Sequence, residues 1–226
     1  MVLNNQILIT IISSMEKKTN TKKISKAVIS RLPAYHRYLR ELIEQGIERV
    51  SSEELSALMH ITASQIRQDL NQFGGFGQQG YGYNVQNLYK EIGRILGVET
   101  PHNLIIIGSG NLGRALVNYK GFADHGFRFC GIFDANPDLA GTETGGLIIR
   151  PMDELESFIK ENDIDIATIV VPREAAKKVA SDLYRMGIRN FWNFAHTELA
   201  LPDDAMVKSV HLLDSLLELS FEISVK

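Results

Sequence analysis

The sequence has little cysteine and no long apolar run, and each absence narrows what the protein can be. Its 226 residues include a single cysteine, Cys130, so no disulfide can form within the chain. Cys130 stands among apolar residues, which favours a small core residue over a redox centre. Stability must therefore come from ordinary hydrophobic cores, which the 44% of hydrophobic residues can supply.

The apolar segment Ile7–Ile12 is far too short to span a bilayer. No basic stretch precedes it and no small-residue cleavage pattern follows it, so we expect no signal peptide and a cytoplasmic protein. We expect residues 1–22 to form an N-terminal tail, with Met15 as an alternative start of translation. Histidines are too scattered to indicate a metal site: His36, His60 and His102.

Charge is distributed unevenly along the chain. Residues 1–97 carry 12 lysines and arginines against 8 acidic residues, whereas residues 98–226 carry 12 against 19. The formal net charge of −3 therefore combines a basic front part of +4 with an acidic back part of −7. This asymmetry is consistent with a front part that meets a polyanion, although +4 alone is an ordinary value.

A glycine fingerprint lies near the middle of the chain. The apolar segment 103–107 is typical of a strand, and Gly108, Gly110 and Gly113 follow with the spacing of a dinucleotide-binding turn. In that motif the first glycine permits the tight turn and the second admits a pyrophosphate. The third packs the helix on the strand, and the helix N-terminus binds the anion.

The next expected strand, 127–133, ends at Asp134, about 20 residues past the last glycine, where a ribose-binding carboxylate belongs. Such a carboxylate repels a 2′-phosphate, and Ala135 and Asn136 offer no compensating cation, so we predict NAD(H) as the cofactor. Roughly 110 residues follow the fingerprint. They suffice for one doubly wound sheet but leave no room for a separate substrate domain.

The front part contains two short capped helices. After expected helices over 23–32 and 34–45, with Pro33 at the start of the second, Ser51–Glu54 is a capping box for a helix over 53–59. Thr62–Gln65 is another box, for a helix that continues to Phe73 and stops at Gly74. Two such helices joined by a tight turn predict a helix-turn-helix, with the second as recognition helix.

A wing and a polar helix face complete the predicted DNA-binding domain. The glycine-punctuated segment Phe76–Tyr83 predicts a hairpin, and Val85–Leu96 a further helix before a linker at 97–101. An ordinary solvated helix face would have a similar composition and stays open as an alternative. The expected DNA contacts are Ser64, Gln65, Arg67, Gln68, Asn71, Gln78 and Tyr81.

The back part alternates strands and helices, which predicts a parallel sheet. The expected strands are 147–149, 166–171, 190–194 and 206–210, and the expected helices are 152–160 and 173–186. A last helix over 211–221 is apolar around most of its circumference, which indicates burial between two bodies and hence a dimer.

Together these residues resemble one family, the redox-sensing transcriptional repressor Rex. The resemblance runs from about Ile24 to the C-terminus. Its most specific stretches are Ile29–Leu32, Gln65–Arg67 with Asp69–Leu70, Gly82–Tyr83, Gly108–Gly113, Tyr119 with Gly121–Phe122, Val171–Ala176 and Asn193–Ala195.

The resemblance implies an α/β protein in which a winged helix-turn-helix domain (23–97) precedes a Rossmann-type doubly wound parallel sheet (98–210). It also implies a homodimer whose C-terminal helix (211–226) is swapped between the partner's two domains. The partner would be operator DNA, bound when NADH is low and released as NADH rises. The protein would then be a regulator and no enzyme.

The resemblance also implies roles for single residues. Arg67 would read a base, Tyr119 would lie near the nicotinamide, and Arg37 and Asp214 would form a switch pair linking the DNA-binding domain to the swapped helix. The implied cofactor contacts are Gly108, Ser109, Gly110, Asn111, Leu112, Gly113, Tyr119, Asp134, Val171 and Pro172.

Two positions depart from the family pattern. Gln68 stands where many relatives have lysine, which puts the operator preference in question, and His196 stands where relatives often have proline.

Two other functions remain as alternatives. An NAD-dependent oxidoreductase with an accessory N-terminal domain would need a proton donor such as Tyr119, His125 or His196, but these residues lack a dehydrogenase spacing. A nucleotide-binding scaffold could instead use its winged helix to bind protein.

Overall fold

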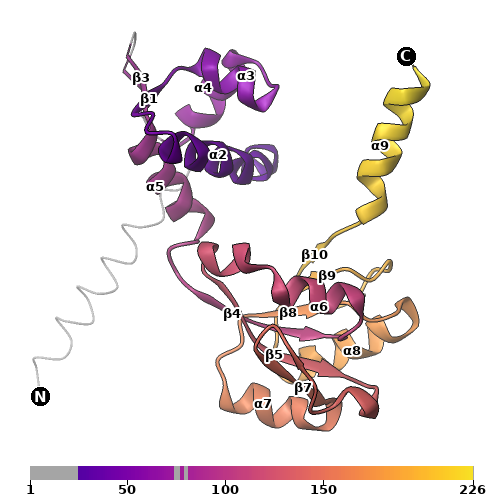
Figure 1. The fold of residues 1–226 in the computed structure, drawn as a ribbon. Helices are drawn as coiled ribbons and strands as arrows, with labels where there is room; N and C mark the ends of the chain where they lie inside the picture. Colours follow the sequence, from indigo (N-terminus) through magenta and orange to yellow (C-terminus); the bar gives the residue numbers. More distant parts are fainter. Residues whose placement is uncertain (1–24, 74–76, 79–80, 226) are drawn as a thin grey trace, which may run out of the picture. The chain divides into compact units, whose positions relative to one another are not determined.

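The computed structural model describes residues 25–73, 77–78 and 81–225, and the side chains of 77–78 are not part of that description. The chain divides into two compact units between Val98 and Glu99 (Figure 1). Each unit has a hydrophobic core of its own. Unit 1 is the part of the chain before Glu99, and unit 2 is the part from Glu99 onward.

Unit 2 is built on a seven-stranded sheet in the order β10-β9-β8-β4-β5-β7-β6. Every pairing is parallel except β6 with β7, which is antiparallel. The strands are β4 (His102–Ile107), β5 (Phe127–Asp134), β6 (Glu143–Thr144), β7 (Leu147–Pro151), β8 (Ile166–Ile169), β9 (Asn190–Asn193) and β10 (Met206–Ser209). The doubly wound parallel sheet predicted from the sequence is confirmed.

Helices cover both faces of this sheet. The buried residues Ile105, Ile107 and Ile169 pack against α7 (Leu155–Glu161) and α8 (Arg173–Arg185). Ile106 and Ile132 point to the other face and pack against α6 (Asn111–Asn118). Figure 1 shows α6 and α7 on opposite sides of the strands. Side chains of a strand alternate between its two faces. The central strand β4 therefore supplies both cores, with Ile105 and Ile107 on one face and Ile106 on the other.

Several helices and strands of unit 2 begin or end a few residues away from the predicted positions. The strand expected over 166–171 ends at Ile169, so Val171 and Pro172 belong to the turn before α8. The helix expected over 152–160 begins as a 3₁₀ turn, Met152–Glu154, before α7. The antiparallel strand β6 was missed because two residues carry no periodic signal.

The last helix, α9 (Leu212–Ser224), has no buried residue in the single chain. Its exposed apolar side chains include Leu213, Leu216, Leu217 and Phe221. The apolar helix predicted from the sequence is therefore present, with its leucines uncovered. No helix among the described residues is both long and apolar enough to cross a bilayer.

Unit 1 combines helices with a small antiparallel sheet in the order β1-β3-β2. The helices are α2 (Lys26–Glu44), α3 (Ser52–Met59), α4 (Ala63–Asn71) and α5 (Val85–Leu96), and the strands are β1 (Arg49–Val50), β2 (Gly77–Gln78) and β3 (Gly82–Asn84). The predicted winged helix-turn-helix is thereby confirmed, with α4 as second helix of the motif and the β2–β3 hairpin as wing.

One prediction about unit 1 is wrong: the two helices expected on either side of Pro33 are one continuous helix, α2. Proline removes one hydrogen bond and disfavours a helix interior. The buried face of α2 nevertheless runs through this point, from Val28 and Leu32 to Tyr35 and Leu39. Packing of that continuous face outweighs the local preference of a single exposed proline.

Capping residues begin the two helices of the helix-turn-helix motif. Ser51 and Glu54 form the complete reciprocal box predicted for α3. Thr62 caps α4 through the Gln65 N–H, but the Gln65 side chain does not return the bond and donates to Asp69 instead. The helix ends at Asn71, two residues before the predicted Phe73, and Gly74 lies outside the described residues.

Asp69 is a fully buried carboxylate in the core between α2 and α4. Arg31 binds it in a bidentate ion pair, with both N···O distances at 2.7 Å. The Tyr35 hydroxyl donates at 3.1 Å and the Gln65 amide at 2.8 Å. Burial by itself would raise the pKa of Asp69, but the hydrogen bonds from Arg31, Gln65 and Tyr35 outweigh it and lower the pKa.

This network fixes the orientation of α4 on α2. The substitution Arg31→Met should show how much the network contributes to stability. Removing the arginine leaves a buried carboxylate without its counter-charge, so we expect the free energy of unfolding to fall by about 3 kcal/mol at pH 7. Urea unfolding of the full chain measures it. The matched control is Arg94→Met, which breaks an exposed pair with Glu91 and should change stability by less than about 1 kcal/mol.

The pH dependence gives this prediction a second test. Asp69 has a lowered pKa in the folded wild type. Its contribution to the free energy of unfolding is therefore complete above the pKa of the unfolded state, and it is lost as the pH falls through the pKa of the folded state. In Arg31→Met, burial dominates and raises the pKa of Asp69. The difference in the free energy of unfolding between wild type and Arg31→Met should therefore become smaller as the pH falls towards 4. A difference that does not change with pH would contradict this account.

Candidate functional site

The glycine turn after β4 brings three backbone segments into close contact. Gly108 has φ +106°, and a Cβ added there would lie 2.8 Å from the Val170 carbonyl oxygen. A Cβ on Gly113 would lie 2.1 Å from the Gly108 carbonyl oxygen. Both positions therefore need glycine for close packing of β4, α6 and the end of β8.

Gly110 differs from its two neighbours in the fingerprint. It is the N-cap of α6 and has no capping side chain, and no atom of the described residues lies within 4 Å of the position of an added Cβ. The start of α6 therefore has room for a phosphate, which the first N–H groups of a helix can bind. Behind the turn, Arg114 Nε donates to the Ser109 carbonyl oxygen at 2.8 Å and holds it in place.

Asp134 lies at the end of β5, next to this turn. One carboxylate oxygen accepts from the backbone N–H and the hydroxyl of Ser109, at 2.6 and 2.7 Å, and the other accepts from the Asn136 N–H at 2.8 Å. Burial would raise the pKa of Asp134, but these hydrogen bonds outweigh it and lower the pKa, so the carboxylate is ionised.

All the remaining predicted cofactor residues except Tyr119 follow the same edge of the sheet. Asn111 and Leu112 form the first turn of α6, and Val171 and Pro172 follow β8, which pairs with β4. Tyr119 stands at the other end of α6, with 62% of its surface exposed. Parallel strands place their carboxyl ends at one edge, and sheets of this class bind ligands where the strand order reverses. In this sheet the order reverses between β4 and β8.

Most of the predicted base-reading residues share one face of α4. Ser64, Arg67, Gln68 and Asn71 are all exposed, at the spacing of a single helix face. Gln65 is the exception, because its amide is directed to the buried Asp69. The structure therefore gives Gln65 a packing role that the sequence pattern did not reveal.

Arg67 is held by the first residues of α3. Its Nη1 donates to the Ser52 hydroxyl at 2.8 Å and to a Glu53 carboxylate oxygen at 3.0 Å. The Ser52 hydroxyl in turn donates to the other Glu53 oxygen at 3.1 Å. Sequence reasoning treated both α3 residues only as part of a helix cap.

Tyr81 directly precedes β3 of the wing and is 69% exposed. Arg49 of β1 donates to the Tyr81 carbonyl oxygen at 3.1 Å, and its guanidinium lies 5.9 Å from the ring centroid. Gln78 lies in β2, opposite Gly82 of β3. This surface therefore combines a cation and an aromatic hydroxyl beside the predicted recognition helix.

The other predicted residues are dispersed. Arg37 is exposed on α2 with its guanidinium 4.8 Å from the Tyr38 ring centroid, and Asp214 is exposed in the first turn of α9. His125 lies 2.7 Å from the Gly121 carbonyl oxygen, and the His196 ring lies 6.1 Å from that of His211. The described residues contain no group of His, Cys, Asp and Glu that could hold a metal ion.

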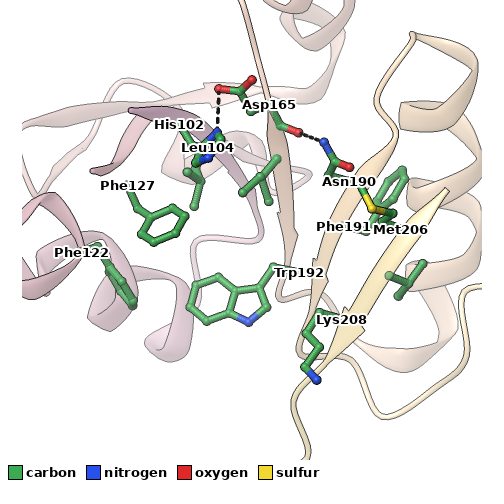
Figure 2. A pocket seen from close by; sticks show the side chains of 12 residues that line it. His102, Leu104, Phe122, Phe127, Asp165, Asn190, Phe191, Trp192, Met206 and Lys208 are labelled. Atoms are coloured by element: carbon green, nitrogen blue, oxygen red, sulfur yellow. Dashed lines mark hydrogen bonds and ion pairs between the residues drawn. The ribbon is translucent and has the colours of Figure 1, made fainter. Parts of the chain in front are cut away.

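Unit 2 also contains an apolar pocket of about 550 Å³. His102, Phe127 and Met206 begin the strands that line it, so it lies at the amino ends of the strands, away from the glycine turn. Figure 2 shows His102 and Phe127 on one side, Phe191 and Met206 on the other, and the Trp192 indole between them. Such an apolar hollow favours a hydrophobic occupant.

Comparisons with known proteins agree with this arrangement. A family model described as "Putative DNA-binding protein N-terminus" matches residues 23–71, and one described as "CoA binding domain" matches residues 99–197. A redox-sensing transcriptional repressor Rex from Clostridium perfringens is 53% identical over 207 residues, covering 92% of this chain and 96% of that protein. The chain belongs to the Rex family.

Solved Rex structures resemble most of the chain as well. The Rex-family repressor RSP in complex with β-NAD+ and operator DNA is 50% identical, with a TM-score of 0.83, over 88% of this chain and 92% of that one. RSP in complex with β-NADH is 46% identical, with a TM-score of 0.83, over 89% and 95%. These Rex relatives are repressors, so the comparisons favour a regulator over the oxidoreductase alternative.

Two glycines of this Rex-family turn give a matched pair of predictions. Gly110→Ala should leave the thermal unfolding midpoint unchanged because the added methyl meets open space, yet it should abolish dinucleotide binding by occupying the pyrophosphate position. Gly113→Ala should instead destabilise the fold itself, because its Cβ meets the Gly108 carbonyl. Thermal unfolding and NADH calorimetry separate the two, and normal NADH binding by Gly110→Ala would contradict the assignment.

Proposed function

We propose that this protein is a redox-sensing transcriptional repressor that binds operator DNA when NADH is low and leaves it when NADH binds. One observation carries the proposal: a winged helix with an exposed polar recognition face and an open dinucleotide turn occur in one Rex-family chain. Residues 23–97 form the DNA-binding domain, 98–210 the NAD(H)-binding domain and 211–226 the dimerisation helix. Such a repressor acts in the cytoplasm, where its DNA lies.

The cofactor is NAD(H), held at the carboxyl ends of β4, β5 and β8. The N–H groups of Gly110, Asn111 and Leu112 receive the pyrophosphate, and the ionised Asp134 receives the adenosine ribose. Val171 and Pro172 border the cofactor from the turn between β8 and α8. The relative RSP has been solved with β-NAD+ and with β-NADH, which supports this assignment.

Tyr119 is the residue that distinguishes reduced from oxidised nicotinamide. The oxidised ring carries a positive charge that NADH lacks, so a neighbouring aromatic hydroxyl favours one form over the other. The Tyr119 ring packs edge-to-face on Phe122, with centroids 5.0 Å apart, and the rest of the side chain is exposed to a ligand.

Operator DNA is contacted by the exposed face of α4 and by the wing. Arg67 reads a guanine in the major groove, and Gln68, where many relatives have lysine, sets which operators are accepted. Ser64 and Asn71 extend this face, and Tyr81 with Arg49 approaches the phosphate backbone. The complex of RSP with operator DNA supports this choice of ligand.

The active form is a homodimer in which α9 is swapped onto the partner. Leu213, Leu216 and Leu217 are exposed in the described part of the chain, an apolar surface that proteins in water rarely leave open. The apolar pocket at the amino ends of the strands offers α9 of a second copy a receiving surface.

The switch works through differential affinity. NADH shifts the protein only if it binds the released arrangement more tightly than the DNA-bound one. In the DNA-bound dimer, Asp214 of α9 pairs with Arg37 of the opposite chain, which ties the swapped helix to the DNA-binding domain. Loss of this pair moves the recognition helices out of register with successive major grooves, about 34–36 Å apart.

Asp134 should select NADH over NADPH. Its carboxylate accepts from ribose hydroxyls but repels a 2′-phosphate, so the wild type should bind NADH far more tightly. Asp134→Ala should weaken NADH binding by roughly 1–3 kcal/mol and narrow its advantage over NADPH. Calorimetry with both nucleotides decides, and equal affinities in the wild type would rule out the NAD(H) assignment.

The function itself is tested by enriching duplexes from random DNA and measuring their gel-shift with NADH or NAD+. The wild type should enrich a defined operator, release it on addition of NADH and keep it with NAD+. Gly110→Ala is the control variant: it should bind the operator equally well and stay bound in the presence of NADH. Failure to enrich any sequence would overturn the proposed function.

A further inference from the structure

The contact between Arg67 and the start of α3 uses one nitrogen of the guanidinium, Nη1. Each guanidinium nitrogen Nη carries two N–H groups, and both groups of Nη1 are accounted for by Ser52 and Glu53. Nε and Nη2 make no hydrogen bond to any described residue. The edge formed by Nε and Nη2 is therefore the one pair of parallel donors that the arginine still offers.

A guanine accepts two such parallel donors. Its O6 and N7 lie side by side in the major groove and are read by an arginine in a bidentate contact. An unrestrained arginine could approach with either edge, or turn to a phosphate. With Nη1 fixed, only the Nε–Nη2 edge can make the bidentate contact, so the plane of the guanidinium is set before DNA arrives.

The clamp is itself held in place by its surroundings. Ser52 is buried and is the first residue of α3, whose N-terminus is fixed by the capping box of Ser51 and Glu54. The Ser52 hydroxyl both accepts from Arg67 and donates to Glu53, which closes a ring of three hydrogen bonds. Hydrogen bonds from the helix N-terminus and Ser52 lower the pKa of Glu53, with Arg67 adding to them.

Stability does not account for this ring. The Arg67 side chain is 51% exposed and that of Glu53 70% exposed. Exposed pairs of this kind contribute little to folding. A carboxylate beside the recognition helix also repels DNA phosphates, which weakens binding to every sequence alike. Its presence at this surface is explained if it improves discrimination between sequences.

We propose that Glu53, together with Ser52, is a positioning residue that fixes the guanidinium of Arg67 so that its Nε–Nη2 edge meets a single guanine. Glu53 thereby determines operator specificity without touching a base. The inference rests on the proposed function, because it needs Arg67 to read DNA. It adds a residue of α3 to the specificity apparatus of α4.

The test compares Glu53→Ala, Glu53→Gln and the wild type on the operator that the wild type enriches and on random duplex of equal length. The ratio of the two affinities should fall about tenfold in Glu53→Ala, within the range for one bidentate base contact. Glu53→Gln keeps the acceptor oxygen but not the charge, and should fall between the two. Thermal unfolding midpoints should not change.

A charge-matched control separates positioning from electrostatics. Glu91→Gln removes the same charge from α5, where Glu91 pairs with Arg94. It should raise binding to both duplexes and leave their ratio unchanged. If Glu53→Gln and Glu91→Gln behave alike, Glu53 acts only through its charge and the inference is wrong.

A double-mutant cycle with Arg67→Ala shows whether Glu53 acts through the arginine. Glu53→Ala should alter the affinity ratio less than about twofold when Arg67 is absent. Repeating the enrichment with the Glu53→Ala protein should relax the preference for guanine at one base pair of each half-site and leave the other positions unchanged. A purely structural role would not produce a loss confined to one base.

The outcomes distinguish this inference from the function on which it rests. If the wild type enriches no operator, the proposed function and the positioning role of Glu53 are both wrong. If it does, but the Glu53→Ala protein returns the same consensus with the same affinity ratio, only the positioning role falls. An equal effect of Glu53→Ala in the presence and absence of Arg67 would overturn it as well.

Discussion

The buried carboxylate of Asp69 is the constraint on which the DNA-binding unit depends. A charge with no exposed surface is tolerated only if it is fully paired, and Arg31, Tyr35 and Gln65 supply that pairing from α2 and from α4 itself. The geometry of these bonds leaves α4 one orientation on α2. Its opposite face, which carries Arg67, is therefore presented outward in a fixed position. An apolar contact of the same area would permit small rotations that a directional ion pair does not.

The nucleotide-binding unit depends on a different kind of constraint, the close approach of backbones. Gly108 and Gly113 let β4, α6 and the end of β8 touch where any side chain would collide with a carbonyl oxygen. Gly110 leaves the helix N-terminus open in the same turn, and the hydrogen bonds from Ser109 keep Asp134 ionised beside it. Within this one motif, Gly108 and Gly113 serve packing, whereas Gly110 serves ligand binding. This separates the residues that hold the turn from the residue that admits the ligand.

Much of the fold and the candidate site could be predicted because the signals are local. The capping box at Ser51, the helix Val85–Leu96 and the glycine spacing after β4 are each written within a few consecutive residues. Prediction failed where burial in the folded protein decides. Pro33 was expected to begin a helix, but the continuous buried face of α2 overrides it. The bond from the Gln65 amide to the buried Asp69 was also not foreseen, because the sequence does not show that Asp69 is buried.

The sequence alone determined the order of the two units, the dinucleotide turn, the acid that follows it and the polar face of the recognition helix. These features depend on spacing along the chain, and spacing is preserved in any fold that the chain adopts. Only the tertiary structure decided which side chains meet across the elements. Arg31 lies 38 residues before Asp69, and Ser52 and Glu53 lie 15 and 14 residues before Arg67. No periodicity links such partners, because their contact arises from the packing of separate helices and not from the local geometry of either one.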